Sequence, residues 1–148
     1  MVEVPDEPAD RERLLAAIAP DRAAATGHHA LLRQILRAEI DDRRATGGGE
    51  FYENLYWAAF LLHLIGDVTD VPALWEAKFL DFDSSIGFDW QYLVGAGIEP
   101  TLAHLRAEGR SAAAEDLADY VDVDDEDADL ARWRSLRRGY FYPGSTGS

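Results

Sequence analysis

The sequence predicts an all-α fold: a compact domain built from antiparallel helical hairpins. Apolar residues recur at the spacing of one helix face, most clearly between residues 28 and 44. Capping residues, prolines and glycines divide the chain into segments of helical length. No run of alternating β-branched residues is long enough to form a sheet.

The first half of the chain predicts two amphipathic helices followed by a connection. Asp10 can cap a first helix, which has to end before Pro20. A second helix is expected at about 28 to 44, with leucine and isoleucine on one stripe and arginine opposite. The glycines after Thr46 end this helix and make a flexible connection.

The third predicted helix, residues 51 to 65, is the most hydrophobic segment. It is apolar all round from Leu55 to Leu62, which predicts a central helix covered on most sides. Gly66 ends it, and Asp70 can cap a short helix with Pro72 in its first turn. The core is expected to contain Trp57, Leu61, Leu62, Leu74, Trp75 and Leu102.

The second half should hold a loop and further helices. The turn-forming residues from Asp81 to Gly87 predict a loop, with Asp83 and Asp89 able to cap the helix that follows. Further helices are expected at about 88–95, 99–108, 111–121 and 127–138. The predicted organisation is a flexible leader (1–8), a single helical domain (9–139) and a flexible tail (140–148).

The composition narrows the class of protein. The net charge is −14, from 28 acidic and 14 basic residues, and this charge repels phosphate backbones, so we expect no nucleic-acid binding. The absence of cysteine excludes disulfides, thiolate metal sites and cysteine nucleophiles. The longest apolar stretch, 55 to 65, is far shorter than the ~20 residues of a membrane span. No secretory signal is recognisable, so we expect a cytoplasmic protein without membrane contact.

One pattern occurs twice. Phe60, Pro72 and Leu74 recur 28 residues later as Phe88, Pro100 and Leu102, around a helix end, a short turn and a new helix start. This pattern resembles the hinge of a HEAT-type repeat, which implies stacked antiparallel helices, a concave surface and a binding role. Two ordinary hairpins that share capping chemistry are the alternative.

A second resemblance concerns residues 52 to 105, with their Leu-Tyr-Trp, Gly-Asp-Val and Phe-Asp-Ser elements. This segment is similar to small uncharacterised bacterial proteins that sit beside toxin genes. Immunity proteins of that kind are often acidic, because they neutralise basic nuclease toxins by charge complementarity. The resemblance implies a basic toxin as partner and assigns no site residue.

An acidic run between residues 119 and 129 holds seven carboxylates and no base. An EF-hand counted from Asp122 fails, because its sixth and twelfth positions hold Asp127 and Trp133. Some of these acids favour the start of the next helix, but their mutual repulsion costs stability unless a basic partner relieves it. A solvated, helix-capping turn is the alternative. The predicted partner-binding residues are Asp122, Asp124, Asp125, Glu126, Asp127 and Asp129, together with Asp81, Asp83 and Trp90.

Two other functions remain open from the sequence. Asp81, Asp83, Asp89 and His104 could form a small metal or acid–base site, although the Glu-x-x-His pattern of carboxylate-bridged bundles is missing. An exposed Trp90 and the aromatic tail suggest a self-assembling structural protein.

The histidines do not suggest a metal site. His28 and His29 are interpreted as solvated cap residues and His63 as a core histidine. The favoured function is a non-enzymatic acidic module that docks a basic protein, as an immunity or antitoxin-type protein does. No catalytic residue, metal or cofactor is predicted.

Overall fold

The computed structural model describes residues 4–23, 27–47, 49, 51–120 and 126–143. In these ranges the chain forms eight α-helices and three short 3-10 helices without any strand, which confirms the predicted all-α class. No helix in this part of the chain has the length and apolar character needed to cross a membrane. The elements are α1 (Pro8–Ala17), η1 (Pro20–Arg22), α2 (His28–Thr46), α3 (Glu53–Ile65), η2 (Val68–Asp70), α4 (Val71–Lys78), α5 (Phe82–Gly87), η3 (Trp90–Val94), α6 (Ile98–Ala107), α7 (Ser111–Tyr120) and α8 (Glu126–Phe141).

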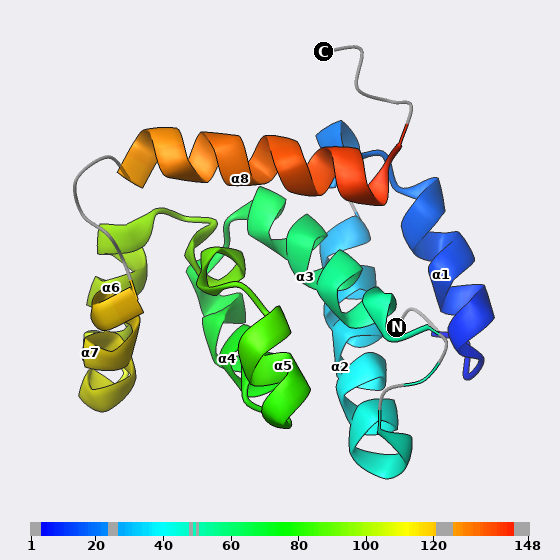
Figure 1. The fold of residues 1–148 in the computed structure, drawn as a ribbon, viewed down its shortest axis with the longest axis horizontal. Coiled ribbons are helices and arrows are strands. Elements are labelled where there is room, and N and C mark those ends of the chain that lie inside the picture. Colours follow the sequence, from blue (N-terminus) through cyan, green and yellow to red (C-terminus); the bar gives the residue numbers. More distant parts are fainter. Residues whose placement is uncertain (1–3, 24–26, 48, 50, 121–125, 144–148) are drawn as a thin grey trace.

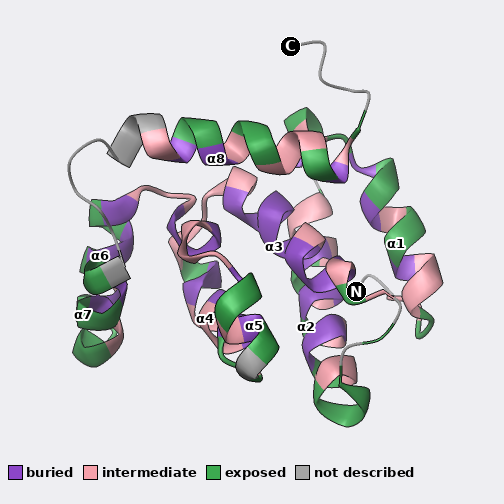
Figure 2. Ribbon diagram, viewed as in Figure 1, coloured by how far each residue is buried: buried purple, intermediate pink, exposed green. Residues whose placement is uncertain are grey.

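Helix α3 lies at the centre of the fold. It contacts α1, α2 and η3, and α8 lies across it on another side (Figure 1). Ala58, Ala59, Phe60 and Leu61 are each 0% exposed, although successive residues of a helix point about 100° apart. Figure 2 shows the same burial along most of the helix. The central, covered helix that the sequence predicted is therefore present.

The predicted core is mostly correct. Leu61, Leu62, Leu74 and Leu102 are buried, whereas Trp57 and Trp75 are only partly buried and pack against the core from its edge.

The end of α8 closes the core over α3. Phe141 stacks on Trp57 and lies 5.6 Å from the ring of Phe60. The hydroxyl of Tyr142 accepts a hydrogen bond from Trp57 Nε1 at 3.0 Å. Helix α8 therefore extends through Phe141, into the segment 140–148 that we expected to be a flexible tail, and places aromatic side chains against the core. Residues 144–148 lie outside the described part.

Helix α1 starts earlier than the sequence suggested. Its first residue is Pro8, whose fixed backbone angle suits that position, and Glu7 precedes it as the N-cap residue. The carboxylate of Asp10 makes no cap and instead pairs with Arg13 one turn further along.

The segment expected to be a loop contains the short helix α5. Asp81 caps it: its carboxylate accepts a hydrogen bond from the Ser84 amide at 2.7 Å, and the Ser84 hydroxyl accepts one from the Asp81 amide at 3.0 Å. The prediction of a loop, and of Asp83 as a cap, was wrong because the residues that make turns are also those that start helices. Asp89 occupies the N-cap position of η3, but its side chain makes no cap hydrogen bond.

The internal similarity does not produce a clear structural repeat. The residues that follow α3 by 28 positions, 81–93, are divided between α5 and η3. Phe60 is therefore in the middle of a long helix, while Phe88 ends a short one. Pro72 and Pro100 both lie in the first turn of a helix, so the common element is capping chemistry.

Two glycines allow the end of α3 to contact the end of η3. Gly66 ends α3 with a φ of 75°, in the left-handed region. A Cβ atom on Gly95 would lie 2.1 Å from the carbonyl oxygen of His63, so no side chain fits between the two backbones.

Gly95→Ala should therefore be strongly destabilising. Overpacking of this kind costs about 1–3 kcal/mol or more, since both contacting groups are backbone. Gly49→Ala is the matched control, because a Cβ there meets no atom within 4 Å. Urea unfolding should give a clearly lower midpoint for Gly95→Ala only. Equal midpoints for the two variants would show that the backbones are not in contact.

Candidate functional site

The arginines of α2 bind acids of the same molecule. Arg33 donates through Nε to Asp70 at 2.6 Å, and Arg37 donates to both carboxylate oxygens of Glu76, each at 2.9 Å. His29 is not the solvated residue that we expected, since its Nε2 lies 2.7 Å from Asp70. These bases hold α2 against η2 and α4 and are not available as a basic patch.

The acidic run is described only in part. Glu126 and Asp127 are the first residues of α8, where acids favour the helix N-terminus. Asp129 pairs with Arg132 at 3.0 Å on the same helix. The members of the predicted surface that lie outside the described residues are Asp122, Asp124 and Asp125.

The other predicted docking residues differ in their surroundings. Asp81 is engaged by Arg43 at 2.9 Å, and this hydrogen bond, together with the Ser84 amide, lowers the pKa of the Asp81 carboxyl. Trp90 is half-buried against the core, so the prediction of an exposed tryptophan was wrong. Asp83 is exposed and lines a small cavity beside Arg43.

The alternative metal or acid–base site is not assembled. Asp89 accepts a hydrogen bond from the indole of Trp133 at 2.9 Å, and Asp81 is bound to arginine as described above. His104 lies on α6, half-buried. Across the described ranges, no three histidine, aspartate or glutamate side chains come together in a group that could hold a metal ion.

His63 is a core histidine, as the sequence predicted. The residue is 2% exposed, and its ring lies 4.8 Å from the ring of Trp133. Burial, and then the charge of Arg134, lower its pKa to about 4, so the ring is neutral near pH 7. Its Nε2 therefore accepts the hydrogen bond that Arg134 donates at 2.9 Å.

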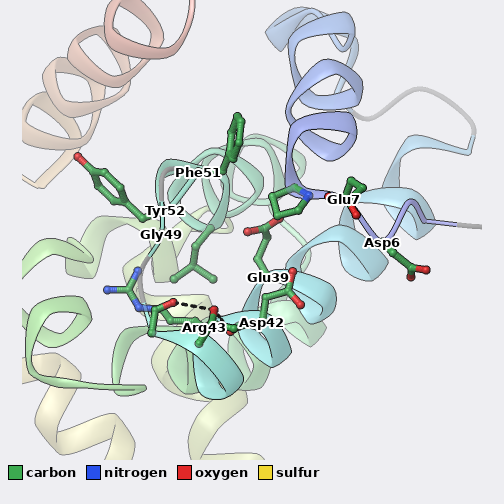
Figure 3. A pocket seen from close by; sticks show the side chains of 12 residues that line it. Asp6, Glu7, Glu39, Asp42, Arg43, Gly49, Phe51 and Tyr52 are labelled. Carbon is green, nitrogen blue, oxygen red and sulfur yellow. Dashed lines mark hydrogen bonds between the residues drawn. The ribbon is translucent and has the colours of Figure 1, made fainter.

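A cavity of about 330 Å³ opens between the start of α1, the second half of α2 and the segment that leads into α3 (Figure 3). Carboxylates dominate its polar lining, and Arg43 is the single base among the lining residues that the structure describes. Pro8, Phe51 and Leu55 supply an apolar wall. The carboxylates that line the cavity are those of Asp6, Glu7, Glu39 and Asp42.

Glu39 is the deepest acid of this pocket. Its side chain is 7% exposed, and its Oε2 accepts hydrogen bonds from Arg11 Nε at 2.5 Å and from Asn54 Nδ2 at 3.3 Å. Burial raises the pKa of the Glu39 carboxyl, and the pairing with Arg11 opposes that rise. Both hydrogen bonds engage the same oxygen, so Oε1 keeps acceptor capacity.

Arg11 holds the acidic wall of the pocket in place from the interior of the protein. Besides Glu39 it pairs with Asp42, and its Nη1 donates to the backbone carbonyls of Pro5 and Asp6 at 2.8 and 2.9 Å. Figure 3 shows Glu39 and Asp42 rising from α2 toward the start of α1, with Asp6 at the rim. Asp6 and Glu7, expected to belong to a flexible leader, thus line the site.

Arg43 lies at the opposite side of the pocket from Asp6 (Figure 3). Its side chain is 8% exposed, donates hydrogen bonds to Asp81 and lies close to the hydroxyl of Tyr56. Arg43, Gly49 and Tyr52 also line a second cavity, of about 420 Å³, so the two cavities adjoin.

The pocket was missed in the sequence, although one signal was available. Glu39 follows Leu32 by seven residues and Ile35 by four, which places it on the apolar stripe of α2. A charged residue on a buried stripe requires a partner. The partner, Arg11, is 28 residues away, and no spacing rule connects the two.

The pairing of Glu76 predicts a defined pH dependence. The hydrogen bond from Arg37, and then that from Arg44, lower the pKa of Glu76 from 4.5 to about 2. A carboxyl with a lowered pKa stabilises the fold above its unfolded pKa and loses this contribution as the pH falls through the folded value.

Glu76→Gln should therefore be less stable than the wild type at pH 7, and the difference in unfolding free energy should shrink between pH 4.5 and about 2. Denaturant unfolding of both proteins at several pH values measures this difference. Asp41→Asn, an exposed acid on α2, is the control. A difference for Glu76→Gln that stays constant down to pH 2 would contradict the pairing.

Comparison with known proteins gives no relative from which a role could be transferred. The chain matches no protein-family model, no curated protein and no solved structure.

Proposed function

We propose that the protein is a non-enzymatic binding module that docks a basic protein partner, in the manner of a cytoplasmic immunity or antitoxin-type protein. One observation supports this above all: the arginines of α2 are used in ion pairs within the fold, whereas the charged side chains that line the open pocket are mainly carboxylates. A surface of this kind attracts a basic protein and repels an acidic one.

The far end of the molecule supports the same proposal. Helices α6 and α7 lie side by side at one end (Figure 1), and their exposed acids outnumber their exposed bases, Arg106 and Arg110. The acidic run of residues 119–129 continues directly from this hairpin. Acids spread over a surface accelerate association with a basic partner by long-range attraction. The exposed acids of the hairpin are Glu99, Glu108, Glu115, Asp116 and Asp119.

Neutralising the acidic run tests this proposal. A variant with four Asp→Asn changes should stay folded, with an unfolding free energy equal to or slightly above that of the wild type, because mutual repulsion is removed. Its association with a basic protein partner, for which the product of a neighbouring gene is the first candidate to test, should be slower, by about tenfold at low salt, and the effect should fade as salt is raised. Stopped-flow or surface-based kinetics measure the association rates of the wild type and of the variant. The residues changed are Asp122, Asp124, Asp125 and Asp127.

A matched control removes four charges elsewhere. These residues lie on α1, η1 and α2, and their own ion pairs are at the surface, where such pairs contribute little to stability. If association depends on the acidic run, the control should associate nearly as fast as the wild type. Equal slowing by both variants would mean that only net charge matters, and no slowing by either would contradict docking through acids. The control residues are Asp10, Glu12, Asp21 and Asp41.

A further inference from the structure

The buried histidine of α3 lies where three elements meet. His63 is near the end of α3, and its ring lies against Trp133 and Arg134 of α8. Backbone groups of Gln91 and Tyr92 in η3 lie beside the same ring. A change in the charge of His63 therefore acts directly on the contact between α3, η3 and α8.

One hydrogen bond determines where the ring can take up a proton. Arg134 donates through Nε to Nε2 of His63 at 2.9 Å, so Nε2 carries a lone pair and the single ring proton of the neutral form is on Nδ1. A second proton can be added only at Nε2. Protonation therefore removes the hydrogen bond and leaves two cations facing each other in a buried place, which is unfavourable.

The other ionisable groups of α8 and η3 are either engaged already or add positive charge. Asp89, directly before η3, accepts a hydrogen bond from the indole of Trp133 at 2.9 Å. Tyr92 stays neutral because burial raises the pKa of its hydroxyl, and Arg137 of α8 adds positive charge beside it. A proton on His63 thus faces arginine, and not a carboxylate, on the α8 side.

The sides of α3 and α2 do not compensate this charge. Residues 57 to 65 of α3 contain no second ionisable side chain. Beyond the end of α3, Asp67 and Asp70 are paired with Arg33 of α2, and Asp70 also with His29. These acids are therefore engaged with α2, and the charge beside the buried ring is set by the arginines of α8.

Helix α8 is attached to the rest of the domain through side chains. Leu130, Trp133 and Phe141 are buried on its inner face, whereas Ser135 and Leu136 are exposed on the opposite face. Within the described ranges, no backbone hydrogen bond joins α8 to another element. The helix can therefore separate as a unit, without breaking the backbone hydrogen bonds of its neighbours.

We propose that α8 is released from the domain in mildly acidic solution, because protonation of His63 Nε2 replaces the hydrogen bond from Arg134 by repulsion. The released state exposes the rings of Trp57 and Phe60, against which Phe141 packs in the closed state. The other helices stay folded, since α1 and α2 still contact α3, and α4 and α6 still contact η3. This conformational switch is independent of the proposed binding function.

The direction of the pH dependence follows from the protons bound in each state. The pKa of His63 is about 4 in the closed state, and exposure to water on release returns it to its ordinary value of 6.5. Between these values the released state binds a proton that the closed state does not, so release becomes more favourable as the pH falls. At pH 5 the equilibrium constant for release should be about 30-fold larger than above pH 7.

Hydrogen exchange at pH 7.5 and pH 5, corrected for the intrinsic exchange rate at each pH, measures this release. The protection of amides 130–138 on α8 should fall by about 30-fold, and at pH 5 it should be well below that of amides 32–40 on α2. Equal protection of the two helices at pH 5 would show that acid unfolds the whole domain together, which overturns the switch.

Three variants assign the response to its residues. His63→Gln keeps an acceptor for Arg134 but takes up no proton in this range, so the protection of α8 should change by less than about threefold between the two pH values. Arg134→Gln keeps a donor and removes the charge, and its response should lie between those of the wild type and His63→Gln. His104→Gln, on α6, is the control and should respond like the wild type.

Far-UV circular dichroism at pH 7.5 shows whether each variant is folded, and Arg134→Gln serves as an independent test if His63→Gln is not. A full wild-type response in folded His63→Gln, or in folded Arg134→Gln, overturns the proposal. Titration of the His63 ring by NMR gives a direct check on the wild type. A ring that takes up its proton near pH 6.5 while α8 stays protected would equally contradict the switch, because charge on His63 would then be compatible with the closed state.

Discussion

A helix that is apolar on every side has to be covered on every side, and this constraint on α3 organises the rest of the fold. Helices α1 and α2 cover part of it, η3 another part, and α8 returns across it from the far end of the chain. The cover is mainly aliphatic on the α2 side and aromatic on the α8 side. Hydrophobic burial of this kind is the largest favourable contribution to folding, so the short helices around α3 need little stability of their own.

The ion pairs follow from the same arrangement. One face of α2 packs on α3, and its opposite face presents arginine to the acids of η2, α4 and α5. At the second turn of α1, one arginine, Arg11, enters the interior and meets Glu39 there. The chain has twice as many acids as bases, and several of its bases are held in ion pairs within the fold, so its surface is negative overall. The binding proposal is thus a consequence of how the fold distributes its charges.

Much of this architecture could be predicted from the sequence, because local signals determine it. The apolar stripe of α2, the all-round apolar run of α3 and the glycine that ends it lie within single segments. The prediction failed where a residue type has two local roles, as at Asp81, which caps α5 where we expected a loop.

Contacts between residues far apart in the sequence could not be predicted, because no local signal indicates them. Tyr142 belongs to the core because it meets Trp57, 85 residues away, and Arg11 meets Glu39 only in the folded chain. The candidate pocket depends on that second contact. Of the predicted site residues, Asp83 lines the adjoining cavity, while Asp81 and Trp90 have structural partners.

Native-state hydrogen exchange tests the central position of α3 most directly. If every face of α3 is covered, the amides of residues 58 to 62 should exchange only when the whole domain unfolds. Their opening free energy should then match the global unfolding free energy from denaturant within about 1 kcal/mol, and it should exceed that of α7. Opening of α3 at a free energy well below the global value, or at the same value as α7, would show that the helix is not the centre on which the fold depends.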